Sequence, residues 1–349
     1  MKEFWSEDIA AIEPYTPGEQ PKGGKWIKLN TNENPYPPSP EVFKAIEKAA
    51  ARLRLYPDPT CADFRLALAE RFGVKKEQVC VGNGSDDVLS LAFKAFFAGK
   101  KRVQFPDISY GFYPVFAEYY KVDHEMIPLN EDFTLPVEKF RGGGGVVFAN
   151  PNAPTGLAIS AAQVAEIARA NPGAVVIADE AYVDFGGESA VPLTKEYKNL
   201  LVVGTLSKSY ALAGLRAGYA VGDENLIAAL EAAKYSVNPY SLDALALAGA
   251  AAAVRDREYF NMRCAMVIAT RERTVAKLRE LGFEVLPSKA NFLFARFPGR
   301  SGKELFEGLR ERGILVRYFE KPRTADFLRI SVGTDEEMDS LCAALAEML

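Results

Sequence analysis

The feature that most constrains the fold is a repeated alternation of short apolar runs and helical stretches through the middle of the chain. The runs at 174–180 and 200–205 are continuously apolar, as is typical of strands buried on both faces of a parallel sheet. Helical patterns separate the apolar runs along the chain. One of them precedes the run at 174–180 and begins at Ser160 with a capping box to Gln163. This alternation predicts an α/β domain with a mostly parallel sheet. Further strands are expected at 79–83, 102–105, 146–150 and 217–222.

The two ends of the chain follow other patterns. Residues 1–35 are rich in Pro, Gly and polar groups, so we expect an extended arm there rather than a helix. Toward the C-terminus a long helical stretch over 256–281 precedes short strands and helices, which is typical of a smaller α+β domain. We therefore expect a large domain over 36–245 and a small C-terminal domain over 246–349.

Composition excludes several classes of function. The 349 residues carry a formal net charge of −4, whereas a nucleic-acid-binding protein usually has a basic excess. No apolar run reaches the roughly eighteen residues of a membrane span, and four widely separated cysteines indicate reduced thiols in a cytoplasmic protein. A single histidine, His124, excludes sites built from several histidines, and no metal site is predicted. We interpret His124 as a structural or surface residue.

One stretch of polar residues carries most of the chemistry. The segment TLSKSYALAGLRAGY begins where an expected strand ends and contains Thr205, Ser207, Lys208 and Arg216. Ligands of open α/β sheets gather at the carboxyl ends of strands. Two hydroxyls and an arginine suit a phosphate dianion, and a lysine among them suits a Schiff base with a carbonyl cofactor. The alternative is an ordinary strand-to-loop junction with an exposed lysine.

Three other loops also follow expected strands. Asp179 ends an apolar run, where a carboxylate needs a partner such as a pyridinium nitrogen, and Tyr182 suits a phenolate oxygen. The loop VGNGSDDV opens a helix that Ser85 is expected to cap, and helix N-termini bind phosphate. Tyr110 is a candidate to stack on a ring, and Asn152 lies in the loop NPNAPTG. Taken singly, each is equally a cap, a core tyrosine or a turn. Together they are the groups that a pyridoxal phosphate enzyme needs.

The chain resembles the class I and II aminotransferases, which are pyridoxal phosphate enzymes of fold type I. The resemblance rests on an ordered set of motifs: GNGSDD, NPNAPTG, DEAY, TLSKSYALAGLRAGY and RISVGT. Within that group, PYTPGEQP, LNTNENPY and YPDP are similar to the histidinol-phosphate aminotransferases. The resemblance implies transamination between L-histidinol phosphate and 2-oxoglutarate, giving imidazole-acetol phosphate and glutamate, in histidine biosynthesis.

The resemblance also implies roles for individual residues. Lys208 would bind pyridoxal 5'-phosphate and move the substrate's proton, Asp179 would keep the pyridine nitrogen protonated, and Tyr182 would hydrogen-bond the ring oxygen. Tyr110 would stack on the ring. Tyr56 would reach the phosphate in the partner subunit, which implies a homodimer with shared active sites. The implied phosphate-binding residues are Ser85, Asp86, Thr205, Ser207 and Arg216. The implied substrate-binding residues are Tyr15, Asn34, Arg317 and Arg329.

One position departs from the family pattern. Many relatives read NPNNPTG, in which the asparagine directly before PTG contacts the ring oxygen of the cofactor. This chain has Ala153 at that position. We predict that Asn152, one residue earlier, takes over the contact.

Other functions on the same fold are open at this point. A threonine-phosphate decarboxylase or an aromatic amino acid aminotransferase would share the cofactor site and differ at the substrate arginines and the arm. A non-catalytic regulator that senses pyridoxal phosphate belongs to another class of protein. Such regulators usually carry a DNA-binding domain, and the acidic charge of this chain disfavours that interpretation.

Overall fold

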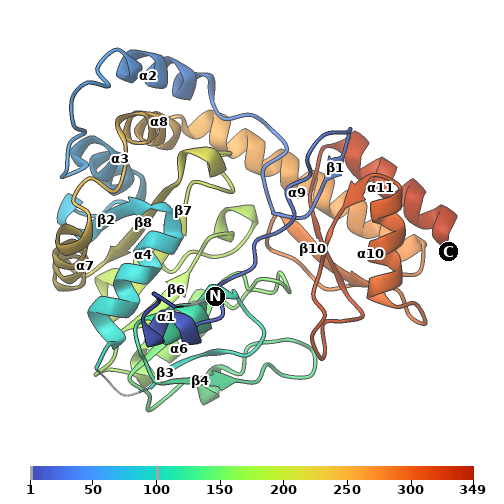
Figure 1. The fold of residues 1–349 in the computed structure, drawn as a ribbon, viewed down its shortest axis with the longest axis horizontal. Helices are drawn as coiled ribbons and strands as arrows, with labels where there is room; N and C mark the ends of the chain where they lie inside the picture. The colour runs from blue at the N-terminus through green and yellow to red at the C-terminus, as the bar shows by residue number, and fades with distance from the viewer. Residues whose placement is uncertain (1–2, 100–101) are drawn as a thin grey trace.

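A seven-stranded sheet forms the centre of the larger part of the molecule (Figure 1). The computed structural model describes residues 3–99 and 102–349. The strand order is β2-β8-β7-β6-β5-β3-β4, and β8 runs antiparallel to both of its neighbours while the other pairs are parallel. The predicted mostly parallel sheet is therefore confirmed. The strands are β2 (Val79–Asn83), β3 (Val103–Pro106), β4 (His124–Ile127), β5 (Gly145–Ala149), β6 (Val176–Asp179), β7 (Leu200–Thr205) and β8 (Ala217–Gly222).

Both faces of this sheet are buried, which explains the continuous apolar runs of its strands. Along β5, Val146 and Phe148 pack in one buried cluster, which also receives Val164 of α6. Val147 points to the opposite face and packs in a second cluster with Phe93. The helices of this part are α2 (Pro40–Ala50), α3 (Ala62–Phe72), α4 (Gly84–Ala92), α5 (Phe112–Tyr119), α6 (Ala161–Ala170), α7 (Glu224–Val237) and α8 (Ala244–Arg255).

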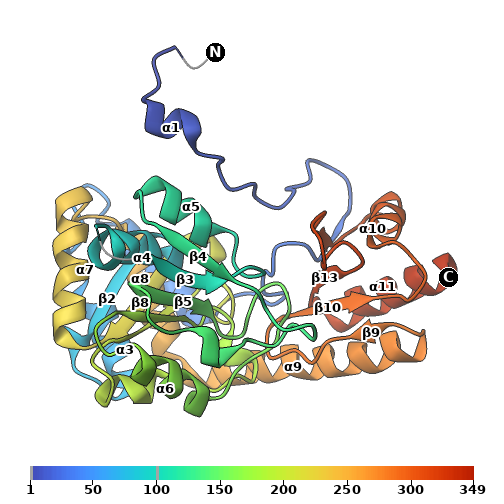
Figure 2. The same ribbon diagram turned by 90° about the horizontal axis from the view of Figure 1, so that it is seen from below.

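The C-terminal part is built on a four-stranded antiparallel sheet in the order β12-β13-β10-β9. Helix α9 (Arg257–Glu280) runs beneath both parts of the molecule, as Figure 2 shows. Its residue Phe260 packs in the core of the large part, and Leu278 packs in the core of the small part. The other elements are β9 (Glu284–Val285), β10 (Phe292–Arg296), α10 (Gly302–Glu311), β12 (Arg317–Tyr318), β13 (Leu328–Ser331) and α11 (Asp335–Met348).

The N-terminal arm connects the two parts. It is largely extended, as predicted, except for the short helix α1 (Glu7–Ala11), in which the backbone N–H of Ile9 donates to the side chain of Ser6. Farther along, β1 (Ile27–Lys28) pairs in parallel with β11 (Ile314–Leu315) of the small part. In Figure 2 the arm passes from α1, on the side of α5, across to the small part.

Two details differ from the sequence predictions or extend them. Helix α4 starts directly at Gly84, whose φ of +81° turns the chain sharply out of β2, so Ser85 lies in the first turn and is not the cap. Helices α7 and α8 were not predicted from the sequence. Helix α8 packs against α2 and α3, and the division of the chain at residue 245 stays a prediction.

Two predictions about the chemistry of the chain can be compared directly with the structure. All four cysteines are buried and free. His124 lies on β4 and stacks on Phe105, with ring centroids 5.3 Å apart, which agrees with a structural role.

Within residues 3–99 and 102–349, none of the helices has the length and apolar character needed to span a bilayer.

Candidate active site

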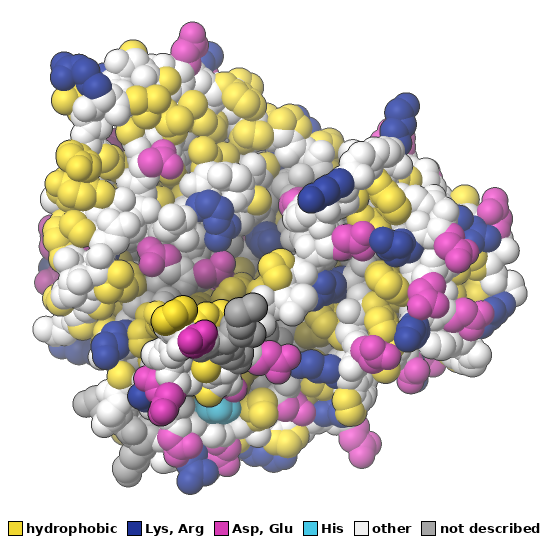
Figure 3. Space-filling view, viewed as in Figure 1, with side chains coloured by type: hydrophobic (Ala, Val, Ile, Leu, Met, Phe, Trp, Pro, Cys, Tyr) yellow, Lys and Arg dark blue, Asp and Glu magenta, His cyan; other side chains and the backbone are white. Residues whose placement is uncertain are grey.

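The carboxyl ends of the central strands open onto a cavity of about 590 Å³, which is also bordered by the arm and the small part. Figure 3 shows the molecule hollowed between its two parts, with basic side chains in and around the hollow. The structure brings most of the predicted site residues together there. Those that line the cavity are Tyr15, Ser85, Asp86, Tyr110, Asp179, Tyr182, Thr205, Ser207, Lys208, Arg216, Arg317 and Arg329.

A cradle for a phosphate group lies where α4 begins. The hydroxyl of Thr205 lies 3.0 Å from the hydroxyl of Ser207, and Arg216 donates to the same serine at 3.3 Å. The start of α4 adds backbone N–H groups and the positive end of a helix dipole. A Cβ at Gly218 would lie only 2.3 Å from the backbone nitrogen of Ser85, so this glycine lets β8 approach the helix start. Hydroxyls, a guanidinium and free N–H groups fit a phosphate dianion.

Lys208 follows β7 and reaches into the same cavity. Its Nζ donates to the carbonyl oxygen of Thr31 at 3.2 Å and lies 5.9 Å from the ring centroid of Tyr182. Burial, aided by the charge of Arg329, lowers the pKa of the Lys208 ammonium to about 8. The neutral amine, which is the form that attacks a carbonyl or accepts a proton, is therefore far more populated near neutral pH than in an ordinary lysine.

Asp179 ends β6 and is 3% exposed. It accepts hydrogen bonds from the hydroxyl of Tyr113 at 2.8 Å and from the backbone N–H of Ala181 at 3.3 Å. Burial raises the pKa of Asp179 to about 6, although both donors act against that rise. A buried carboxylate whose partners among the described residues are neutral donors suits the protonated nitrogen of a pyridine ring.

Sequence reasoning missed Tyr113. It lies three residues after Tyr110 in the same aromatic segment, and this spacing could have indicated that the two side chains are neighbours; their ring centroids are 5.7 Å apart. Tyr110 itself lines the cavity, and its hydroxyl donates to Asp86 at 2.7 Å. Asp86 also pairs with Arg216 at 3.2 Å, so the tyrosine is tied to the phosphate cradle.

Two arginines of the small part face the cavity. Arg329 donates to the carbonyl oxygen of Asn30 at 2.8 Å, while its Nε is buried without a hydrogen-bond partner among the described residues. Arg317 donates to the carbonyl oxygens of Thr16 and Pro17 and thereby holds the arm against the cavity. An unpartnered, buried N–H of a cationic group is a strong site for an anion.

Tyr15 belongs to this side of the cavity. It stacks on Phe112, with ring centroids 4.3 Å apart, and lies 6.2 Å from Tyr110. The aromatic contact therefore fixes the arm over α5.

The structure does not place Asn152 at the cavity. Its amide nitrogen donates to the carbonyl oxygen of Ile108 and to the hydroxyl of Thr155, and its oxygen accepts from Ser109. All its polar atoms are thus used within the protein, and it is Ala153 that lines the cavity instead. The expected replacement of the missing asparagine by its neighbour finds no support in this geometry.

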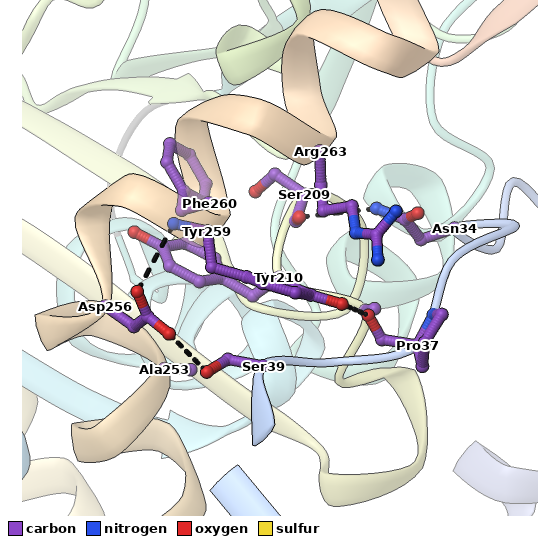
Figure 4. Close-up of a pocket in the computed structure, with 11 residues that line it drawn as sticks. Asn34, Pro37, Ser39, Ser209, Tyr210, Ala253, Asp256, Tyr259, Phe260 and Arg263 are labelled. Atoms are coloured by element: carbon purple, nitrogen blue, oxygen red, sulfur yellow. Dashed lines mark hydrogen bonds between the residues drawn. The ribbon is translucent and has the colours of Figure 1, made fainter. Parts of the chain in front are cut away.

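Asn34 and Tyr56 also lie outside the cavity of this chain. The amide of Asn34 donates to the carbonyl oxygens of Lys208 and Ser209 and so braces the lysine loop from behind. It lines a separate small pocket, which is drawn in Figure 4. Tyr56 is 84% exposed and stacks on Tyr240, with centroids 4.8 Å apart. Its predicted contact with a partner's phosphate stays a prediction.

This cavity fits an aromatic aldehyde that carries a phosphate group, which Arg216 would bind, and a ring nitrogen, which Asp179 would contact. The fold is that of the fold-type I enzymes. The family model for class I and II aminotransferases matches residues 24–345, and the chain belongs to this family. The cofactor of these enzymes is pyridoxal 5'-phosphate.

Within the family, this chain is similar over its whole length to histidinol-phosphate aminotransferases. It is 51% identical to that of Clostridium acetobutylicum, with 100% of both chains covered. It is 52% identical to that of Marinomonas sp. (strain MWYL1), with 99% of both covered. Among solved structures, the Sinorhizobium meliloti histidinol-phosphate aminotransferase in complex with pyridoxal-5'-phosphate has a TM-score of 0.83 at 25% identity. That match covers 92% of this chain and 90% of that one.

Proposed function

We propose that this chain transfers an amino group between L-histidinol phosphate and 2-oxoglutarate, forming imidazole-acetol phosphate and glutamate in histidine biosynthesis. The observation that carries the proposal is identity of about half over full length to enzymes of that name. The cavity supports it with a second cationic site at Arg329, which is separate from the phosphate cradle at Arg216. Every substrate of this reaction is anionic, so each one needs such a site.

The residues that line the cavity have different roles in the reaction. Bound pyridoxal phosphate supplies an electron sink that makes the α-hydrogen of the substrate acidic. Lys208 would hold the cofactor and, as a neutral amine, would accept the proton that leaves the α-carbon. Asp179 keeps a proton on the ring nitrogen, and Tyr182 donates to the ring oxygen. Ser207 and Arg216 hold the cofactor's phosphate.

The substrate's anionic end is assigned to Arg329. Its buried Nε needs an acceptor, and a phosphate or carboxylate oxygen supplies one. Arg317 and Tyr15 close the same side of the cavity by fixing the arm. The Nε of Arg329 is buried from water, which strengthens the interaction between the guanidinium and the anion.

The assembly proposed for this enzyme is a homodimer with shared active sites. Tyr56 does not approach the cavity of its own chain and is almost fully exposed, beside the exposed Leu53 and Leu55. This arrangement suits a loop that is covered by a partner and reaches the partner's cofactor phosphate. The four free cysteines favour a reducing compartment, so the cytoplasm is the proposed location.

A half-reaction tests the substrate. The holoenzyme is mixed with L-histidinol phosphate without an oxoacid, and the visible absorption of the cofactor is followed. We expect faster loss of the absorption band with L-histidinol phosphate than with phenylalanine or threonine phosphate. A faster reaction with phenylalanine would contradict the proposed substrate in favour of an aromatic amino acid. Release of CO₂ from threonine phosphate would contradict it in favour of a decarboxylase. A protein that never acquires the visible band with pyridoxal phosphate would remove the proposal altogether.

A further inference from the structure

The cofactor's ring oxygen meets a site that lacks one donor of the family pattern. Ala153 carries no polar group, and the amide of Asn152 is used by Ser109, Ile108 and Thr155. The hydroxyl of Tyr182 is therefore the side-chain donor on which the proposed ring-oxygen contact depends. A phenol hydroxyl turns easily about its C–O bond, so its direction has to be fixed by something else.

Asn32 contacts that hydroxyl directly. Its Nδ2 donates to Tyr182 Oη at 3.1 Å, and the asparagine is 1% exposed. The backbone N–H of Asn32 donates to the hydroxyl of Ser331 at 2.8 Å. That hydroxyl donates in turn to Oδ1 of Asn32 at 3.0 Å. Since Oδ1 faces this hydroxyl, the NH₂ group must face Tyr182. The orientation of the amide is thus set by its own partners.

The backbone of Asn32 is held as firmly as its side chain. Its φ is +56°, a left-handed conformation that asparagine tolerates better than most other residues. The amide of Asn291 donates to its carbonyl oxygen at 3.0 Å. Asn291 and Ser331 belong to the small part and Tyr182 to the large part, so Asn32 links the two across the cavity.

We propose that Asn32 is a positioning residue that aims the hydroxyl of Tyr182 at the ring oxygen of the cofactor, in place of the amide missing at position 153. The hydrogen of a phenol lies near the ring plane on one of two sides of the oxygen. The N–H of Asn32 occupies the acceptor site on one side, and its positive hydrogen repels the phenol hydrogen from that side. The phenol hydrogen is left to point to the other side, from which it would be free to donate to the ring oxygen of a bound cofactor.

This inference rests on the proposed function, because it needs bound pyridoxal phosphate. It predicts a spectroscopic effect rather than only a change of activity. Donors on the ring oxygen draw negative charge away from it and weaken its hold on the neighbouring proton at the attachment site. Loss of an aligned donor therefore raises the pH midpoint at which the visible absorption of the bound cofactor changes.

The experiment compares pH titrations of the visible spectrum for holoenzymes. We expect Asn32→Ala to raise the midpoint by about 0.7 pH unit, since a hydrogen bond is worth about 1 kcal/mol. The matched control Asn225→Ala removes an exposed amide in the first turn of α7 and should leave the midpoint unchanged. The double variant Asn32→Ala with Ala153→Asn should return toward the wild-type midpoint, because position 153 then supplies a direct donor.

Two further variants keep the test decisive if Asn32→Ala does not fold. Ala153→Asn alone should lower the midpoint, and Ser331→Ala, which frees the amide to rotate, should raise it. Unchanged midpoints in the folded variants would overturn the role of Asn32. A wild-type protein without a cofactor band, or one that ignores L-histidinol phosphate, would instead count against the proposed function.

Discussion

Tyr113 donates its hydroxyl to the carboxylate of Asp179 at 2.8 Å, and both side chains are almost completely buried. Burial alone disfavours the charged carboxylate, and this hydrogen bond is the largest influence that opposes it. The balance leaves the pKa of Asp179 at about 6 before any cation is bound. The carboxylate is therefore charged at neutral pH and available to a protonated ring nitrogen.

Tyr113→Phe should weaken cofactor binding most at low pH. Loss of the donor raises the pKa of Asp179 further above 6, and an aspartate is protonated below its pKa. The charged form is then lost at a higher pH than in the wild type. Titration of the apoprotein with pyridoxal phosphate at pH 6 and pH 8 measures this. We expect a loss of about fivefold to tenfold in affinity at pH 6, and a smaller loss at pH 8. Equal losses at both pH values would contradict the assignment.

Lys208→Ala should abolish turnover while the phosphate cradle still holds the cofactor. The lysine supplies both the covalent attachment and the base, so we expect kcat to fall by roughly 10⁴-fold or more. Reduction with borohydride followed by mass spectrometry gives a second readout. The wild type should gain the mass of the reduced cofactor, and the variant should not. Lys289→Ala, which removes a lysine that does not line the cavity, serves as the control. Substantial turnover by Lys208→Ala would remove this lysine from the mechanism.

The rate of attachment of the cofactor should follow the protonation of Lys208. Burial and the charge of Arg329 lower its pKa to about 8. Because the neutral amine is the nucleophile, the rate constant for reconstitution of the apoprotein should rise with pH up to about 8 and then level off. Stopped-flow measurements between pH 6 and pH 10 give the profile. A rate that keeps rising to pH 10 would indicate an ordinary exposed lysine.

Arg329→Ala should raise KM for L-histidinol phosphate and for glutamate by roughly 100-fold, since each substrate loses a charge-assisted contact. Steady-state kinetics with both substrates measure the change. The control is Arg310→Ala, which breaks the exposed ion pair between Arg310 and Glu19 on the arm and should change KM by less than about twofold. A KM that rises for one substrate only would confine Arg329 to that half-reaction.

The sequence predicted the large sheet well because its strands are apolar on both faces, and it predicted the start of α6 because Ser160 and Gln163 form a capping box. The strands at 200–205 and 217–222 agree with β7 and β8 to the residue. The direction of strand pairing was harder to predict, because no sequence pattern within β8 indicates that it runs antiparallel to its neighbours. Helix α8 was missed because its alanine-rich sequence is apolar nearly all round and gives a weak helical pattern.

The cavity was predictable where side chains follow strands directly. Lys208 and Asp179 were found for that reason, because parallel strands bring their carboxyl ends to one edge. Asn32 and Asn152 were not predictable in the same way. Both are asparagines in polar loops, and only tertiary contacts direct one amide to Tyr182 and the other to the carbonyl oxygen of Ile108. Tyr56 depends on a partner chain, which no pattern within one chain can position.

Mixing Tyr56→Ala with Lys208→Ala, at a cofactor concentration too low to load Tyr56→Ala alone, tests whether Tyr56 acts across a dimer. We expect Tyr56→Ala to weaken cofactor binding, because its phosphate loses a contact from the partner subunit. In a dimer of Tyr56→Ala with Lys208→Ala, one active site carries both defects, whereas the other combines an intact Lys208 with an intact Tyr56. Random re-pairing should therefore restore about a quarter of wild-type activity per subunit. If Tyr56 served its own chain instead, each mixed dimer would hold one defect in each site, and mixing would restore nothing.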